Sequence, residues 1–315
     1  MSKLQHSKHN HVHNHGNHIH QEGKNLLAAT FLNFAITIVE IIGGVLSNSL
    51  ALLSDAIHNL GDTFAVMLAY IANKISHRDA TRQKTFGYKR IEILAALFNA
   101  VVLIAITIFL FIEAYHRFFT PEVIKGKLML VVSIIGLIAN LAAVLLLKND
   151  SEANINIRAA YLHLLGDTIS SVAVIIVAIL IWFYKIFLVD PIITVIIGLY
   201  ILKEAYSIMK EALDILMQST PASVNISDIV VELEKFQDVA NIHHVHSWKL
   251  NDKQIHFECH VDVSKDILIS ETDLLRLEIE KTLKLKFGIS HVTIQFEYNC
   301  CTEKDIIHFH EKRGI

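Results

Sequence analysis

The hydrophobic and polar positions of this chain divide it into an apolar first two thirds and a mixed last third. Crossing the hydrocarbon core of a bilayer takes about 20 apolar residues in helical conformation. Six stretches before about residue 209 meet that requirement, and we predict a membrane-spanning helix in each of them. They cover residues 26–46, 50–72, 91–113, 127–147, 159–183 and 188–208.

The last third of the chain has the pattern of a small soluble domain. Helical periodicity predicts two helices, and alternating β-branched residues predict three strands. The helices are expected at 224–236 and 271–287, and the strands at 240–250, 254–263 and 291–298. Ser223 or Asn225 is expected to cap the first helix, and Gly288 is expected to end the second. This order of elements predicts a compact α+β domain with ferredoxin-like content.

These patterns divide the chain into four expected segments. An α-helical membrane domain of six transmembrane helices covers 26–209, and the α+β domain covers 210–300. A disordered His-rich tail is expected at 1–25, and a short C-terminal tail at 301–315. Lysine and arginine are most frequent in the segment between the second and third predicted spans, and such residues favour the cytoplasmic side. Both termini and the α+β domain are therefore expected in the cytoplasm.

Charge and cysteine content narrow the classes of function. A formal net charge of −3 gives no reason to expect nucleic acid as a partner. The three cysteines, Cys259, Cys300 and Cys301, form no disulfide framework and fit a reducing cytosolic environment. The abundance of Ile, Asn and Lys and the short connections favour a bacterial inner membrane as the location.

Histidine is the residue type that changes the picture most. There are 19 histidines, and the first twenty residues contain His6, His9, His11, His13, His15, His18 and His20. Neutral imidazole is a good ligand for zinc, copper and nickel. Irregular spacing among asparagines favours a natural metal-buffering tail over a cloned affinity tag. Near the C-terminus, a second set of possible metal ligands either captures zinc from the cytosol or belongs to a solvated tail. This set consists of Cys300, Cys301, His308 and His310.

A six-residue motif occurs twice within the apolar part. His58–Thr63 and His163–Thr168 match at five of six positions. The histidine and the aspartate of each copy are four residues apart and therefore share one face of a helix. Two such helices facing each other would present two nitrogens and two oxygens, a ligand set that suits tetrahedral zinc. The expected ligands are His58, Asp62, His163 and Asp167. A purely structural hydrogen-bond network is the weaker alternative, because charged groups inside a bilayer are costly and usually functional.

Other polar and small residues lie near this motif. Asp55 could hydrogen-bond one of the ligands, or it could lie at the end of a water path to the site. Alternatively, it caps the start of its helix. Gly61 and Gly166 are expected to let neighbouring helices approach closely. Four further polar residues of the spans either line a cavity or bridge helices, and they are Asn33, Glu40, Asn99 and Asn140.

With these residues in view, the chain resembles the cation diffusion facilitator family of zinc transporters from about residue 26 to 298. The resemblance rests on the two motifs and on four further stretches: Ser54–Ala56, Phe86–Glu92, His244–Trp248 and Thr293–Glu297. It implies a homodimer in the lipid bilayer that exports zinc in exchange for protons by alternating access. It also implies that the four motif ligands form the transport site.

The resemblance further implies a regulatory metal site in the α+β domain, at His243, His260 and Glu297. Gln295 stands where some family members have a histidine ligand, and Asp273 matches another ligand position by spacing alone. A single metal site is therefore expected rather than a bridged pair. In the connection between the second and third spans, where the family has a further site, only His77 and Asp79 are available.

Strand alternation bears on the same domain. His244 and His246 should face the side of their strand opposite to His243 and Val245, so only one of these sets can share a site. Metal binding at His260 is expected, and His246 is the alternative candidate.

Two classes of function fit these patterns. The first is proton-coupled export of zinc, with cadmium, cobalt or other divalent cations as further substrates. The alternative is a membrane-bound zinc sensor that binds the ion without moving it. No enzyme activity is expected, because the chain contains no His-Glu-x-x-His sequence of a metalloprotease.

Overall fold

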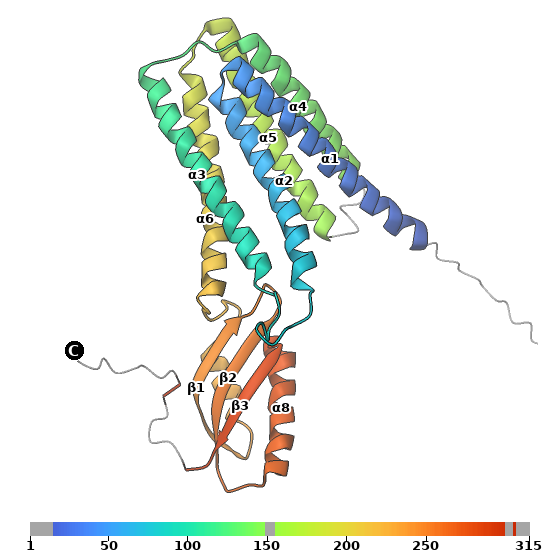
Figure 1. Ribbon diagram of the computed structural model, residues 1–315, viewed down its shortest axis with the longest axis vertical. Coiled ribbons are helices and arrows are strands. Elements are labelled where there is room, and N and C mark those ends of the chain that lie inside the picture. The colour runs from blue at the N-terminus through green and yellow to red at the C-terminus, as the bar shows by residue number, and fades with distance from the viewer. Residues whose placement is uncertain (1–14, 149–154, 300–304, 307–315) are drawn as a thin grey trace, which may run out of the picture. The chain divides into compact units, whose positions relative to one another are not determined.

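The computed structural model describes residues 15–148, 155–299 and 305–306 (Figure 1). The first six helices follow one another without an intervening strand. They are α1 (His15–Ser47), α2 (Leu50–Ser76), α3 (Ile91–Phe119), α4 (Gly126–Leu147), α5 (Ile155–Tyr184) and α6 (Val189–Leu216). Contacts divide the chain into two units. The first comprises residues 1–66 and 102–204, and the second comprises 67–101 and 205–315.

Five of these helices, α1 and α3 to α6, are long and apolar enough to cross a membrane. Helix α2 is the sixth expected span, and its 27 residues reach about 40 Å, more than the hydrocarbon thickness. Its apolar character is interrupted by Asp55, His58, Asn59 and Asp62. The helix that carries the first motif is thus the one of the six without an apolar stretch of full membrane length.

Two helix ends differ from the sequence prediction. Helix α1 begins at His15, so the expected disordered tail is helical from His15 to residue 25, and residues 1–14 lie outside the described part. Extending an existing helix adds one hydrogen bond for each residue fixed, and no proline stops it in this stretch. Helix α6 continues past residue 209 to Leu216.

The α+β domain contains α7 (Ile226–Leu233), β1 (Val239–Lys249), β2 (Ile255–Val263), α8 (Ile269–Phe287) and β3 (His291–Glu297). The sheet order is β1-β2-β3. Strands β1 and β2 form an antiparallel hairpin, whereas β2 and β3 are parallel and are joined through α8. The helical part followed by this small domain confirms the expected fold class.

Local signals in the α+β domain act as predicted. The side chain of Asn225 caps α7 by accepting a hydrogen bond from the backbone N–H of Ser227. In the hairpin turn, Asn251 Oδ1 accepts from the backbone N–H groups of Lys253 and Gln254. Gly288 ends α8 with a φ of 67°, a left-handed conformation that glycine adopts at little cost.

The two faces of the sheet have different roles. Phe257, Cys259 and Val261 of β2 belong to the buried core, together with Ile229 of α7 and Ile279 of α8. Successive residues of a strand point to opposite faces. The intervening polar residues of β2, which include His256 and His260, therefore lie on the face away from the two helices.

Candidate metal-binding sites

Helices α2 and α5 run side by side in opposite directions (Figure 1). Three polar pairs connect them, and as the residue number rises on α2 it falls on α5. The pairs are Asp55 with Ser170, His58 with Asp167, and Asp62 with His163. This antiparallel register sets the histidine of each motif opposite the aspartate of the other.

The four motif side chains face one another between α2 and α5. His163 Nε2 lies 3.0 Å from Asp62 Oδ2 and 3.8 Å from Asp167 Oδ2. His58 Nε2 lies 3.7 Å from Asp62 Oδ2 and 3.6 Å from Asp167 Oδ1. In a tetrahedral site with metal–ligand bonds of about 2.1 Å, neighbouring ligand atoms are about 3.4 Å apart. The four nitrogen–oxygen distances given above are close to that value. Single ligand atoms of His58, Asp62 and Asp167 lie within 4.8 Å of one another, a spacing that could hold a metal ion. His163 lies beside this group of three and contacts it through Asp62.

Burial is uneven across this group. His58 and Asp167 are buried, whereas the side chain of His163 is 40% exposed and that of Asp62 is 30% exposed. Asp167 Oδ2 is buried and accepts no hydrogen bond within the described part of the chain. A cavity of about 210 Å³ reaches Asp62 and His163, and Asn33 of α1 and Leu147 of α4 also line it. An ion can therefore approach the two exposed ligands first.

Asp55 supports α5 and does not cap its helix. Helix α2 begins at Leu50, so Asp55 is in its second turn, where it is buried and accepts a hydrogen bond from Ser170 Oγ at 2.5 Å. The capping alternative is therefore wrong. Ser170 lies three residues after Asp167, on the same face of α5, and this spacing is the sequence signal for the contact.

Asp190, at the start of α6, caps α2 instead. Its carboxylate accepts hydrogen bonds from Ser49 Oγ at 2.6 Å and from the backbone N–H groups of Leu50 at 2.8 Å and Ala51 at 3.2 Å. Sequence reasoning missed this residue, because the cap comes from a position far along the chain. The contact fixes the start of the helix that carries His58 and Asp62.

Glu40 bridges two helices next to the site. Glu40 of α1 is buried, and its Oε2 accepts a hydrogen bond from Asn59 Nδ2 of α2 at 3.1 Å. Gly136 of α4 leaves the space for this carboxylate, since a Cβ there would meet Glu40 Oε1. Asn140 Nδ2 similarly donates to Ser171 Oγ of α5 at 3.1 Å. The buried polar residues thus tie α1 and α4 to the helices that carry the ligands.

The two motif glycines differ in their surroundings. A Cβ on Gly61 would meet Leu103 of α3, so this glycine does permit a close approach. A Cβ on Gly166 would meet no atom within 4 Å. The expectation of close packing at Gly166 is therefore wrong, because this position faces open space.

A second group of ligand types lies on the sheet of the α+β domain. His260 Nδ1 lies 2.9 Å from Glu297 Oε1, and His243 Nε2 lies 3.3 Å from Glu297 Oε2. One ligand atom from each residue lies within 4.8 Å of the others. The structure thus brings together the three residues that the sequence prediction grouped.

The orientation of His243 suits a metal ligand. Its Nδ1 lies 3.1 Å from Asn241 Oδ1, and an N–H at that position can donate to the amide oxygen. Nε2 then keeps its lone pair, is buried, and makes no hydrogen bond within the described residues. Metal-binding histidines are commonly oriented in this way through their second nitrogen. Gln295 Nε2 donates to Glu297 Oε1 at 2.7 Å, so the amide supports the carboxylate.

Strand alternation fails where β1 carries its histidines. His243 pairs with His260 and His246 pairs with Glu258, so an extra residue bulges between them, and His244 has a φ of 51°. The ring of His244 stacks on His260 at 4.6 Å, and the ring of His243 lies 5.4 Å from His260. The expectation that these two neighbours face opposite sides is wrong, because the bulge turns both toward His260.

Several other candidates lie outside these groups. Asp273 is exposed on α8 and pairs with Arg276. Within the described chain, neither group of ligand types includes His77, Asp79 or His246. Cys300, Cys301, His308 and His310 lie outside the described residues. Burial raises the pKa of the Cys259 thiol to about 12, so this cysteine stays protonated at neutral pH.

Comparison with known proteins relates both parts of the chain to a family. A family profile described as the cation efflux transmembrane domain matches residues 26–217, and one described as the cytoplasmic domain of cation efflux proteins matches residues 221–299. The cadmium, cobalt and zinc/H(+)-K(+) antiporter of Bacillus subtilis is 41% identical over 289 residues, which cover 91% of each chain.

Two further relatives are of similar length. The zinc transporter ZitB of Escherichia coli is 37% identical over 300 residues, which cover 94% of this chain and 95% of the relative. The metal cation efflux system protein CzcD of Cupriavidus metallidurans is 37% identical over 297 residues, which cover 94% and 92%.

Proposed function

Since the chain belongs to the cation diffusion facilitator family and is a membrane protein of divalent metal efflux, we propose that it exports zinc in exchange for protons by alternating access. The observation that carries this proposal is the clustering of two imidazoles and two carboxylates between α2 and α5, three of which offer ligand atoms within 4.8 Å of one another. Those ligands are His58, Asp62, His163 and Asp167. Cadmium and cobalt, which appear in the name of the Bacillus subtilis relative, are proposed as further substrates.

Competition between zinc and protons for the same atoms would couple the two fluxes. Zinc binding needs a neutral imidazole and an ionised carboxylate, so metal binding releases protons. An unperturbed imidazole titrates near pH 6.5, close to physiological pH. A site open to the cytoplasm would therefore load zinc and lose protons. The same site open to a more acidic exterior would take up protons and release zinc.

A membrane-bound zinc sensor is the second candidate, and the group of His243, His260 and Glu297 in the α+β domain is the observation that favours it. A sensor would bind zinc without moving it. Transport explains more of the structure, because the site between α2 and α5 sits within two long helices and has an access cavity on one side.

Flux through the purified full-length protein separates the two candidates. Liposomes with an imposed pH gradient are expected to accumulate zinc in proportion to the gradient, with protons moving the opposite way. One arm omits potassium, which appears in the name of the Bacillus subtilis relative. Flux that persists without potassium supports exchange with protons alone. Zinc binding without flux above that of empty liposomes would favour the sensor.

We further propose a homodimer in a bacterial inner membrane, with both termini in the cytoplasm. The cytoplasmic-domain profile supports that placement for residues 221–299, and the relatives described above are bacterial proteins of similar length. The excess of Lys and Arg between α2 and α3 supports the same orientation.

A regulatory zinc ion is proposed at His243, His260 and Glu297. The spacing of the three ligand atoms and the free lone pair of His243 support it. A fourth position would remain for water or for another ligand, because zinc is usually four-coordinate.

Replacing His260 with alanine tests this site in the full-length protein. The test uses an Asp167→Asn background, in which the site between α2 and α5 is weakened. In that background, His260→Ala is expected to lower the affinity of the α+β domain for zinc by at least about 100-fold, because it removes a ligand. Isothermal titration in detergent measures the effect. His246→Ala is the matched control, since His246 is on the same strand and outside the ligand group. Equal affinities for the His260→Ala protein and its parent would exclude the site.

A further inference from the structure

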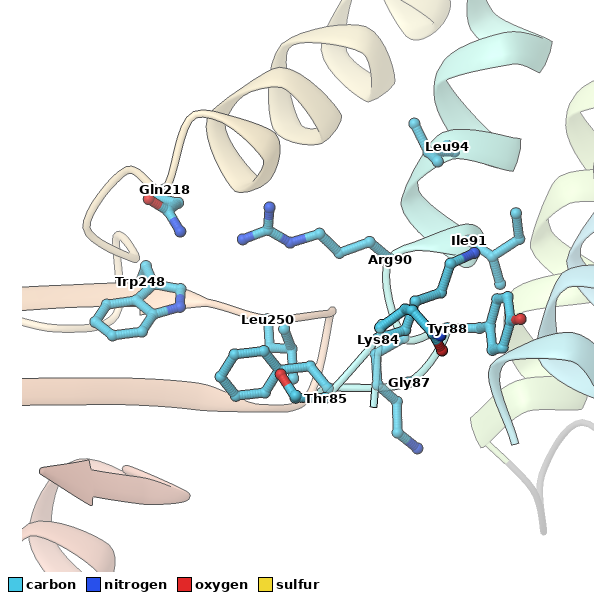
Figure 2. A pocket seen from close by; sticks show the side chains of 13 residues that line it. Lys84, Thr85, Gly87, Tyr88, Arg90, Ile91, Leu94, Gln218, Trp248 and Leu250 are labelled. Carbon is cyan, nitrogen blue, oxygen red and sulfur yellow. The ribbon is translucent and has the colours of Figure 1, made fainter. Parts of the chain in front are cut away.

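The connection between α2 and α3 forms one wall of a cavity that neither metal site uses (Figure 2). Its volume is about 500 Å³. The start of α3, Gln218 after α6, and Trp248 and Leu250 at the end of β1 complete the lining. All of these residues belong to the second unit of the chain. Most of the Phe86–Glu92 stretch also lines the cavity, and neither candidate metal site includes a residue of that stretch.

The charged residues of this lining all have the same sign. Lys84, Lys89 and Arg90 line the cavity, and no aspartate or glutamate does. Among the described residues, none of the three cations takes part in an ion pair. The acid nearest in sequence to Lys89 and Arg90 is Glu92, which is held by α2, where its Oε1 accepts from Ser76 Oγ at 2.6 Å and from Asn73 Nδ2 at 3.2 Å. The cations are therefore available to an anionic ligand.

The cations line different parts of the cavity wall. Figure 2 shows the Arg90 side chain extending from the start of α3 into the space between Trp248 and Gln218. Lys84 Nζ lies 4.1 Å from the ring centroid of Tyr88, a cation–π contact that holds the ammonium group near the same wall. A planar guanidinium can bind two oxygens of one phosphate, and an ammonium group adds a point charge beside it.

An apolar path begins beside these charges. Ile91 and Leu94 line the cavity, and Ile91 is the first residue of the apolar span of α3. Leu94, Phe98 and Val101 are all exposed, and their spacing of four and then three residues puts them on one face of α3. The cations thus lie directly outside an apolar span, and an exposed apolar stripe continues from the cavity along that span.

We propose that this cavity binds the headgroup of an anionic phospholipid. The phosphate would contact Arg90, while Lys84 and Lys89 would add positive charge to the same cavity. An acyl chain would follow Leu94 and Phe98. Clusters of cations at the cytoplasmic end of a transmembrane helix attract anionic lipid, and aromatic residues are frequent at the same depth. A free phosphate ion would use the same cations, but it would leave the apolar stripe without a role. The site extends the proposed function and does not depend on the metal ligands.

Lipid retention by the full-length protein tests the proposal. Native mass spectrometry in mixed micelles would compare phosphatidylglycerol with phosphatidylcholine. One cation at a membrane surface contributes about fivefold in affinity, so Lys89→Gln with Arg90→Gln should weaken phosphatidylglycerol binding about 25-fold and leave phosphatidylcholine binding unchanged. Arg82→Gln is the matched control, because Arg82 is in the same connection but does not line the cavity. If the double variant fails to fold, Lys84→Gln provides the test instead, because Lys84 is at an exposed loop position. It should weaken phosphatidylglycerol binding about fivefold.

Two further arms separate the sources of the phosphate group. Leu94→Gln is expected to weaken phosphatidylglycerol binding while leaving the binding of inorganic phosphate unchanged. The thermal stability of the protein would be compared with inorganic phosphate and with phosphatidylglycerol at equal concentration. Equal stabilisation by the two would assign the cavity to a free anion and overturn the proposal of a lipid site. Unchanged lipid retention in the cation variants, or an equal loss in Arg82→Gln, would also overturn it.

Discussion

Asp167→Asn is expected to reduce zinc flux into liposomes by at least about 100-fold. The side chain is 2% exposed, and its carboxylate oxygens lie 3.6 Å from His58 Nε2 and 3.8 Å from His163 Nε2, so it faces both histidines of the proposed site. Asparagine has nearly the same shape but carries no charge, and its amide N–H₂ group would repel a cation. Mutating a residue that hydrogen-bonds to a metal ligand already costs about 10- to 100-fold in metal affinity, and loss of a charged ligand should cost more.

The neighbouring residue supplies the control for this experiment. Thr168 Oγ1 donates to the backbone carbonyl of Leu164 at 2.8 Å, within its own helix. Thr168→Ala is therefore expected to keep most of the flux. The measurement is the initial rate of zinc uptake under a fixed pH gradient, with equal amounts of folded protein in each liposome preparation. An Asp167→Asn protein that retained half of the wild-type rate would rule out the proposed site.

Asp190→Ala is expected to produce the largest loss of stability, about 2–4 kcal/mol. The substitution removes the acceptor of Ser49 Oγ and of the first two backbone N–H groups of α2, and all three donors would stay buried without a partner. Loss of a helix cap costs about 0.5–2 kcal/mol, and each buried donor left unpaired adds about 1–3 kcal/mol, partly offset by relaxation. The thermal unfolding midpoint in detergent measures the effect.

Two variants on the same helix bracket this result. Asp190→Asn keeps one side-chain oxygen as an acceptor and should lose less stability than alanine. Asp214→Ala changes an exposed aspartate at the other end of α6 and should shift the free energy of unfolding by less than about 0.5 kcal/mol. If Asp190→Ala and Asp214→Ala had the same midpoint, the cap would contribute nothing measurable.

The repeated motif allowed the ligand group to be predicted because its information is local. A spacing of four residues sets His58 and Asp62 on one helix face, and the same holds for the second copy. The pairing of α2 with α5 needed only the assumption that two such faces meet. The two family profiles match residues 26–217 and 221–299.

The features that sequence reasoning missed depend on distant contacts or on irregular backbone. Asp190 caps a helix whose start is about 140 positions earlier, and no local pattern signals that contact. The bulge at His244 cannot be inferred from alternation, because alternation is the rule that a bulge breaks. Gly166 matches Gly61 in the motif, yet the two glycines meet different neighbours in the folded chain.

The antiparallel register of α2 and α5 gives the ligand group a local two-fold symmetry. Turning the pair of helices end over end exchanges His58 with His163 and Asp62 with Asp167, so the same set of groups meets an ion from either side of the membrane. A symmetric ligand set has no polarity of its own. In the proposed exchange, the direction of net ion movement would then come from the concentration gradients across the membrane, and asymmetric surroundings such as the cavity beside His163 would affect only the rates of access.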